Sequence, residues 1–153
     1  SKFIIHKLFG NVSGKKIAIL GFAFKANTND TRNSSCINIC NDLIEEGAIL
    51  NIYDPKVSKN QIRSDLNSVS KISNSHNQGE WNFSYSIEEA ADQCDAIVVL
   101  TEWDEFKFIN WDNISNMMRK PSWIFDTRAC IDLDAVKKSG FNFWRLGREV
   151  SEE

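Results

Sequence analysis

The sequence predicts a doubly wound, Rossmann-like α/β domain of three layers, with a parallel sheet between two layers of helices. Two uninterrupted apolar runs, residues 17–20 and 96–100, are typical of strands that are covered on both faces. Stretches with a helical spacing of apolar residues alternate with strand-like stretches along the chain, and this alternation favours right-handed β-α-β units. The length of 153 residues is that of one domain with a sizeable core.

The first strand leads into a turn and a helix. The strand ends at Gly21, and Ser34 or Ser35 can cap a helix whose apolar residues recur until Gly47. Open α/β sheets bind ligands at the carboxyl ends of their strands, and the N-terminus of a helix favours anions. Residues 15–35 therefore predict a nucleotide or phosphate site.

A second strand, residues 48–53, ends at Asp54, because the proline that follows has no N–H group to continue the sheet. An acid at this position is similar to the ribose-binding residue of dinucleotide folds. The first turn contains no GxGxxG, however, and Asp54 lies further from Gly21 than the spacing of about 20 residues in that fingerprint. We predict that Asp54 mainly forms the turn. Residues 56–78, rich in Ser, Asn and Lys, predict a loop excursion with one short helix.

The later elements continue the alternation. Residues 81–85 alternate apolar with polar side chains, as a half-exposed strand does, and Ser86 starts a capping box for a helix that extends to about residue 94. After the strand at 96–100, Glu102 is interpreted as a ribose-hydroxyl acceptor, a partner for lysine or a solvated side chain. The remaining segments are predicted as short helices at 104–108 and 111–118, a strand at 123–125, a helix at 131–137 and a strand at 141–146.

Two terminal segments are expected to lie outside the α/β domain, which we place at residues 11–147. Residues 1–10 read as the end of a truncated helix, because the apolar side chains of residues 2–9 fall largely on one side and Gly10 is a plausible stop. Residues 148–153 are charged and are expected to form a mobile tail.

The composition excludes several classes of protein. A net charge of −3 argues against nucleic-acid binding, and the absence of a long apolar span or a signal-like start argues against membrane insertion and secretion. The four cysteines show no CxxC pairing, so we expect buried free thiols in a reducing cytoplasm and no metal site. Cys130, beside Arg128, is the one candidate nucleophile, and no partner histidine accompanies it.

Three cations come from separate places in the chain: Lys25, Arg32 and Arg128. If the first and fourth strands are neighbours, the turns after them meet, and Arg128 enters from the next strand. Converging cations suit a diphosphate, because charge-assisted and bidentate contacts of arginine are strong. The alternative for each arginine is a salt bridge, with Asp30 or Asp126 as the obvious partners.

Four blocks of sequence carry a resemblance to a known family: GFAFKANTNDTRNSS at residues 21–35, IYDPKV at 52–57, TEWDEF at 101–106 and FDTR at 125–128. In this order and spacing, the chain resembles the carboxyl-terminal, UDP-binding domain of the UDP-glucose 6-dehydrogenase family. The resemblance implies that Phe24, Lys25 and Arg128 bind the nucleotide sugar, and that Arg32 reaches an NAD bound mainly by a separate amino-terminal domain. Two positions depart from the family pattern: Asn33 replaces a usual Glu, and Thr127 replaces a frequent Gly.

The resemblance also implies a longer parent protein, an NAD-dependent enzyme that oxidises UDP-glucose to UDP-glucuronate. Neither the family's cysteine motif nor its dinucleotide fingerprint occurs here. We therefore predict that this chain has no catalytic residue and no dehydrogenase activity alone, and that it works with amino-terminal and central domains in a homo-oligomer. The alternatives are the same domain of a GDP-mannose or UDP-N-acetylhexosamine dehydrogenase, a non-catalytic α/β binding module, and a purely structural oligomerisation domain.

Overall fold

The computed structural model describes residues 10–32, 34–70 and 79–145, and the side chains of these residues except 67–70. The described part of the chain contains one six-stranded sheet, with every neighbouring pair parallel and the order β3-β2-β1-β4-β5-β6. This is the doubly wound order that the alternation of elements predicts. The strands are β1 (Lys16–Leu20), β2 (Ile49–Tyr53), β3 (Glu80–Phe83), β4 (Ala96–Val99), β5 (Trp123–Asp126) and β6 (Asn142–Arg145).

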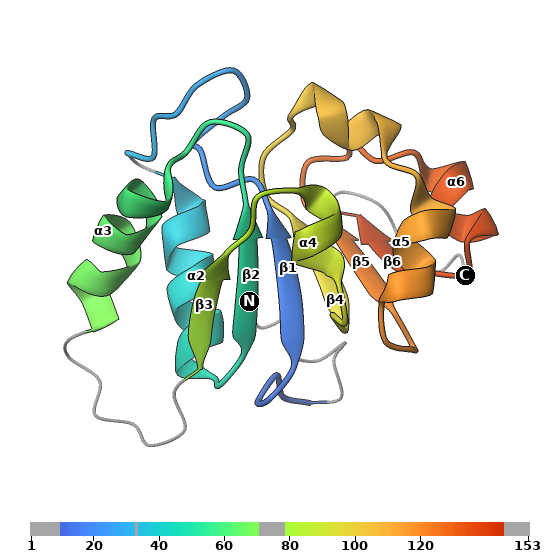
Figure 1. Ribbon diagram of the computed structural model, residues 1–153, viewed down its shortest axis with the longest axis horizontal. Helices are drawn as coiled ribbons and strands as arrows, with labels where there is room; N and C mark the ends of the chain where they lie inside the picture. The colour runs from blue at the N-terminus through green and yellow to red at the C-terminus, as the bar shows by residue number, and fades with distance from the viewer. Residues whose placement is uncertain (1–9, 33, 71–78, 146–153) are drawn as a thin grey trace.

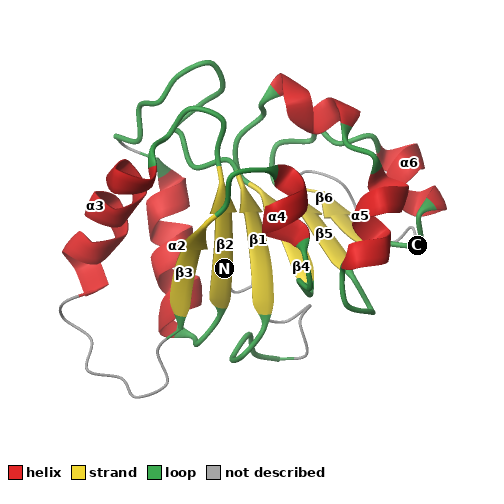
Figure 2. Ribbon diagram, viewed as in Figure 1, coloured by secondary structure: helices red, strands yellow, loops and turns green. Residues whose placement is uncertain are grey.

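Helices cover both faces of the sheet, so the three predicted layers are confirmed (Figures 1 and 2). The helix α4 lies in front of the central strands in Figure 1, and α2 lies behind them. Right-handed crossovers account for this division, because the chain moves in opposite directions across the sheet before and after β3. The helical segments are α2 (Ser35–Glu45), α3 (Lys59–Ser70), α4 (Ile87–Ala91), the 3₁₀ helix η1 (Asp104–Phe108), α5 (Trp111–Met117) and α6 (Leu133–Lys138).

The core is centred on β1 and β4. Every residue of β4, and every residue of β1 except Lys16, is buried, as continuous apolar runs predict. From behind, α2 packs Cys36, Cys40 and Leu43 against the sheet. The edge strand β3 alternates exposed and half-buried residues, so its predicted half-exposure is also confirmed.

Most predicted element ends are close to the observed ones. Ser34 caps α2 by accepting a hydrogen bond from the N–H group of Cys36, and Ser86 caps α4 by accepting one from Glu89. The main difference is α3, which has 12 residues where a short helix was expected, because Ile62 and Leu66 are both fully buried in the core. The predicted helix at residues 2–9 and tail at 148–153 lie outside the described residues.

The helix α4 is shorter than predicted, since it ends at Ala91 and not near residue 94. The chain leaves the helical conformation at Asp92, where ψ is 125°, and Gln93 then takes a left-handed φ of 61° and donates its N–H group to the carbonyl oxygen of Met117 in α5. None of the helices in the described ranges is long and apolar enough to cross a membrane.

Candidate functional site

The loops that follow β1, β4 and β5 gather at the edge of the sheet to which the strand arrows point (Figure 1). The first and fourth strands are neighbours, as predicted, and their loops touch. Gly21 has a φ of +98°, and a Cβ atom at this position would lie only 2.5 Å from the Cβ atom of Thr101. The hydroxyl group of Thr101 donates to the carbonyl oxygen of Ala23 at 2.9 Å. Only glycine fits this close approach without a shift of the backbone.

The β1 loop, residues 21–34, carries the predicted pair Phe24 and Lys25. The N–H group of Phe24 donates to the carbonyl oxygen of Asp30 at 2.7 Å, which closes the loop on itself. Phe24 is a large apolar residue with 43% of its surface exposed. Lys25 is exposed and has no hydrogen bond or ion pair among the described residues. Both side chains are therefore free to meet a ligand at this edge of the sheet.

Asp54 is the residue that fixes the β1 loop. It directly follows β2, and only 4% of its surface is exposed. One carboxylate oxygen accepts hydrogen bonds from the N–H groups of Phe22 and Ala23, at 2.8 and 3.0 Å, and from the indole of Trp103 at 3.2 Å. A single carboxylate thus ties the start of the β1 loop to the segment that follows β4.

The predicted turn-forming role of Asp54 is confirmed by its second oxygen, which accepts hydrogen bonds from the N–H groups of Lys56 and Val57. The sequence reasoning missed the long-range contacts to the β1 loop and Trp103. No local sequence pattern predicts these contacts, because the partners of Asp54 lie 31 to 49 residues away in the sequence. The same contacts exclude the ribose-binding role, because all of the observed donors surround the carboxylate and leave it buried. The first turn and Asp54 therefore do not fit a dinucleotide held by this domain in the usual Rossmann manner.

Arg128 bridges the three loops. Its Nε donates to the carbonyl oxygen of Leu100 at 3.1 Å, and its Nη2 approaches the carbonyl oxygen of Phe24 at 3.5 Å. Its ionic partner is Glu102, with 3.4 Å between Nε and Oε1, and not Asp126 as the salt-bridge alternative suggested. The other terminal nitrogen, Nη1, has no hydrogen bond among the described residues. Arginine donates five N–H groups, so part of this guanidinium remains available for an oxyanion.

Asp126 has a different task from the one expected, because it shapes the loop that carries Arg128. Its fully buried carboxylate accepts hydrogen bonds from the N–H groups of Arg128 and Ile131, both at 3.0 Å. Arg145, on β6, neutralises it with an ion pair of 3.2 Å and also donates to the carbonyl oxygen of Ile131. Arg145 was not singled out in the sequence, where a charged residue near the chain's end carries no such signal.

The two departures from the family pattern have different outcomes. Thr127 donates its hydroxyl group to the carbonyl oxygen of Val99 at 2.6 Å, so it extends the contact between β5 and β4 by one residue. Arg128 still reaches the loops after β1 and β4, and the threonine does not prevent its placement. Asn33 lies outside the described residues.

Arg32 does not join this group. Its guanidinium forms a two-pronged pair with Asp30, with Nε and Nη2 each 3.0 Å from a carboxylate oxygen, and 86% of the Arg32 side chain is exposed. The hydrogen bonds and charge of Arg32 lower the pKa of Asp30 to about 2. In the described chain, the salt-bridge alternative holds for Arg32. The structure therefore brings Arg128 and Phe24 together, places Lys25 next to them, and gives Arg32 no contact with Arg128.

The four cysteines are free thiols, as predicted, and Cys36, Cys40 and Cys94 are buried. Burial first, and then the nearby charges of Asp126 and Glu102, raise the pKa of Cys130 to about 12 against the opposing charge of Arg145. Burial likewise raises the pKa of Cys94 to about 12. Cys130 is therefore a thiol at neutral pH and is poorly suited to act as a nucleophile.

The fold and the loops define a class of protein. A doubly wound parallel sheet with arginine, lysine and an exposed aromatic ring at its carboxyl edge is a nucleotide-binding domain of Rossmann type. Residues 18–133 match the model of the UDP-glucose/GDP-mannose dehydrogenase family, UDP binding domain. The chain belongs to this family.

Several relatives carry the name UDP-glucose 6-dehydrogenase. The Caenorhabditis elegans protein is 45% identical over 94% of this chain, and the Drosophila melanogaster protein is 42% identical over 97%. The Gallus gallus protein is 44% identical over 97% of this chain. The chain spans only about 30% of the length of these relatives, covering 30%, 32% and 30% of them.

Solved structures of similar fold come from related dehydrogenases. A UDP-D-ManNAc dehydrogenase from Pyrococcus horikoshii aligns with a TM-score of 0.69 at 30% identity, over 94% of this chain and 28% of that one. An NDP-N-acetyl-D-galactosaminuronic acid dehydrogenase from Methanosarcina mazei aligns with a TM-score of 0.73 at 25% identity, over 95% of this chain and 27% of that one. The predicted fold and family are confirmed.

Proposed function

We propose that this chain is the nucleotide-sugar-binding domain of a longer UDP-glucose 6-dehydrogenase, in which Phe24, Lys25 and Arg128 hold the nucleotide sugar. The observation that carries the proposal is the position of Arg128, which lies between the loops after β1 and β4 with Nη1 unengaged by the described residues. A diphosphate at this point would accept hydrogen bonds from Arg128, and the positive charge of Lys25 would attract it. The exposed ring of Phe24 supplies an apolar surface for the base or sugar.

The longer protein would convert UDP-glucose, two NAD and water into UDP-glucuronate and two NADH. NAD would be the hydride acceptor of this reaction. We propose that a separate amino-terminal domain binds it, because the buried carboxylate of Asp54 is not available to a ribose here. Arg32, exposed at the outer side of the β1 loop, is proposed to contact that NAD from this domain. We further propose a cytoplasmic homo-oligomer, in which amino-terminal and central domains complete the active site.

A second candidate is the same domain of an enzyme that acts on another nucleotide sugar. The specific support is the structural likeness to two dehydrogenases whose names state N-acetylated sugar substrates, at 30% and 25% identity. The same arginine and lysine would serve this function, because the diphosphate is common to these substrates.

The test is an NMR titration of the labelled chain with UDP, UDP-glucose, UDP-N-acetylmannosamine, GDP and NAD. Saturable shifts at Phe24, Lys25 and Arg128 are expected for the UDP ligands, with weak affinity because only one wall of the site is present. Arg128→Ala and Lys25→Ala should each lower the affinity of the chain for UDP at least tenfold. Arg63→Ala, which removes an exposed arginine on α3, is the matched control and should leave UDP binding unchanged.

The proposal fails if no UDP ligand shifts these signals, or if Arg63→Ala weakens UDP as much as Arg128→Ala. Tighter binding of UDP-N-acetylmannosamine than of UDP-glucose would favour the second candidate, and preference for GDP would point to a GDP-mannose enzyme. The purified chain is also expected to form no NADH from UDP-glucose and NAD; NADH formation would contradict its assignment as a binding domain alone.

A further inference from the structure

A pocket of about 490 Å³ is lined by none of Phe24, Lys25, Arg32 and Arg128, and the proposed function makes no use of it. Its walls come from the end of β2, the start of α4, and the segment from η1 to the start of α5. This volume is within the range of ligand sites. The lining residues are Tyr53, Tyr85, Ser86, Ile87, Glu88, Glu105, Phe108, Ile109 and Asn110.

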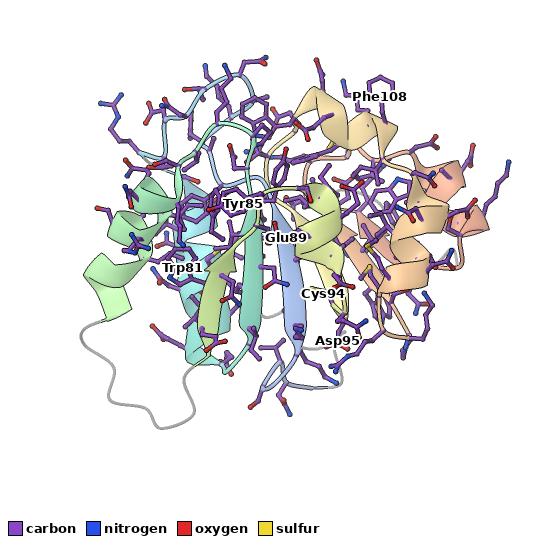
Figure 3. The ribbon with its side chains drawn as sticks, viewed as in Figure 1. Trp81, Tyr85, Glu89, Cys94, Asp95 and Phe108 are labelled. Atoms are coloured by element: carbon purple, nitrogen blue, oxygen red, sulfur yellow. The ribbon has the colours of Figure 1, made fainter. Side chains whose placement is uncertain are left out.

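Exposed aromatic rings gather at this pocket. Among the described residues, Phe24, Tyr85 and Phe108 are the large apolar side chains classed as exposed, and two of the three line the pocket. Tyr85 is 73% exposed and Phe108 is 83% exposed. Figure 3 shows Tyr85 beside α4 and Phe108 at the outer edge of η1. Large apolar side chains exposed together around a concave surface are a signature of an interaction site.

Two of the aromatic residues that line the pocket, Tyr85 and Tyr53, are held in place by contacts with neighbouring residues. The ring of Tyr85 meets Phe83 edge to face, with 4.9 Å between centroids. The backbone N–H group of Tyr85 donates to Glu89 at 2.7 Å, so the capping box of α4 also fixes the start of this wall (Figure 3). On the other wall, the hydroxyl group of Tyr53 donates to Glu105 Oε2 at 2.8 Å. A preformed surface loses little conformational freedom when it binds.

The charge of the lining is negative. It contains the carboxylates of Glu88 and Glu105 and no lysine, arginine or histidine. The nearest basic residue along the chain, Lys107, is outside the lining and pairs with Asp104 at 3.3 Å. Burial, the hydrogen bond to Glu105 and the nearby carboxylates together raise the pKa of Tyr53. In the described chain the side chain of Glu88 and Oε1 of Glu105 have no hydrogen-bond partner, so both remain able to accept.

We propose that this pocket is a docking site for a protein segment that inserts an arginine side chain. Carboxylates beside aromatic faces suit a guanidinium, which donates two parallel hydrogen bonds to a carboxylate and stacks on rings. A nucleotide is disfavoured here, because its phosphates would meet two carboxylates and no cation. A small free cation would leave the outer parts of Tyr85 and Phe108 uncovered, whereas residues flanking an arginine in a polypeptide would cover them.

The inference is tested with two short peptides, acetyl-Gly-Leu-Arg-Leu-Gly-amide and its counterpart in which neutral citrulline replaces arginine. Citrulline keeps the shape of arginine and removes its charge. In NMR titrations of the chain, the arginine peptide should produce saturable shifts at Tyr85, Glu88, Glu105 and Phe108, and the citrulline peptide should bind at least tenfold more weakly. UDP should leave these signals unchanged.

Two variants locate the binding. Glu105→Gln keeps an oxygen for the hydroxyl group of Tyr53 but removes the charge, and Phe108→Ala removes a ring that is mostly in solvent. Each variant should lower the affinity for the arginine peptide at least tenfold, with little change in the Tm of the protein. The matched controls, Glu80→Gln at the start of β3 and Phe24→Ala in the β1 loop, should leave it unchanged.

Equal binding of the two peptides would overturn the inference, as would peptide shifts outside this pocket. Shifts of the pocket residues by UDP would also overturn it, because the pocket would then belong to the nucleotide site. Loss of UDP binding with retained peptide binding would contradict only the proposed function, so the two can fail separately.

Discussion

At the scale of single residues, two buried aspartates that end strands organise the loops of the site. Asp54 accepts N–H groups from the β1 loop and from its own turn, as well as the indole of Trp103. Asp126 does the same for the loop that carries Arg128. Neither residue is a candidate ligand contact, since 4% and 0% of their surfaces are exposed. The loops that carry the proposed ligand-binding residues are therefore held by two buried carboxylates.

Replacing Asp54 by asparagine should destabilise the protein and weaken UDP binding. Asparagine has one acceptor oxygen, so at least two of the five donors around Asp54 would lose their partner, at a cost of about 1–3 kcal/mol for each buried group. We expect the free energy of unfolding in urea to fall by about 2–4 kcal/mol. The control is Asp132→Asn at the start of α6, where asparagine caps a helix as well as aspartate does and little change is expected. Equal effects of the two variants would contradict the role of Asp54.

The thiols should react slowly in the folded protein. At pH 8 a cysteine with a pKa of about 12 has roughly 1,000-fold less thiolate than an unperturbed one. Ellman's reagent should therefore label none of the four cysteines within minutes, and all four once guanidinium chloride unfolds the chain. Ser13→Cys, in an exposed turn, is the positive control and should add one fast-reacting thiol. Rapid labelling of Cys130 in the native protein would show that its environment is more open than described.

At the scale of elements, the critical contact is the approach of the β1 end to the β4 end. The two strands pair in register from Ile17 with Ala96 to Leu20 with Val99. Beyond them, the N–H group of Leu100 donates to the carbonyl oxygen of Leu20, so the pairing continues to the point where the loops diverge. The strand order reverses here, and this is where we propose that the nucleotide sugar binds.

The variant Gly21→Ala should lower stability more than Gly14→Ala does. Both positions have positive φ, +98° and +76°, so each alanine adds a strain of about 1 kcal/mol. At Gly14 nothing lies within 4 Å of the added Cβ atom, whereas at Gly21 it would press on the side chain and the backbone nitrogen of Thr101, at 2.5 and 2.8 Å. We expect Gly21→Ala to reduce the free energy of unfolding by about 1–3 kcal/mol beyond the control, as overpacking does. Thermal or urea unfolding measures this, and equal losses would refute a tight contact.

At the scale of the whole molecule, the two ends of the parallel strands carry different kinds of residues. The carboxyl ends of the strands carry the exposed side chains of Phe24, Lys25 and Arg128. At the amino ends of the strands, Asp95 connects β1, β4 and the segment after α5. Its carboxylate accepts a hydrogen bond from the N–H group of Lys16 at 2.9 Å and forms an ion pair with Arg119 at 2.8 Å. Asp95 and Arg119 therefore link β1, β4 and the segment after α5 at the end of the sheet away from the proposed site.

The ion pair at this end of the sheet predicts loss of stability in acid. Burial raises the pKa of Asp95, but the hydrogen bonds from Arg119 and Lys16 and the nearby positive charges outweigh burial, so the pKa is lower than usual in the folded state. A lowered folded pKa gives stability that is present above the unfolded value of about 3.9 and is lost as pH falls below it. Urea unfolding of wild type and Asp95→Asn should be measured from pH 7 to pH 3. The difference in free energy of unfolding that favours wild type should shrink as the pH falls below about 3.9. An advantage that stays constant to pH 3 would exclude the linkage.

Local patterns in the amino-acid sequence were enough to predict the fold class, the order of the helices and strands, and most of their ends. Continuous apolar runs, serine caps and glycine stops are local signals, and local signals suffice where the backbone of one element depends on its own residues. They also identified Phe24, Lys25 and Arg128 as residues at strand ends, and the family followed from the same blocks.

Which of those residues contact one another depends on how the chain folds. Arg128 lies against Phe24 across 104 positions of sequence, whereas Arg32 turns to Asp30 only two positions away. The tasks of Asp54, Asp126 and Arg145, and the pocket beside Tyr53, also emerged only from the folded chain. The physical reason is that a buried carboxylate or a pocket takes its partners from several elements at once, and those elements come together only when the sheet is assembled.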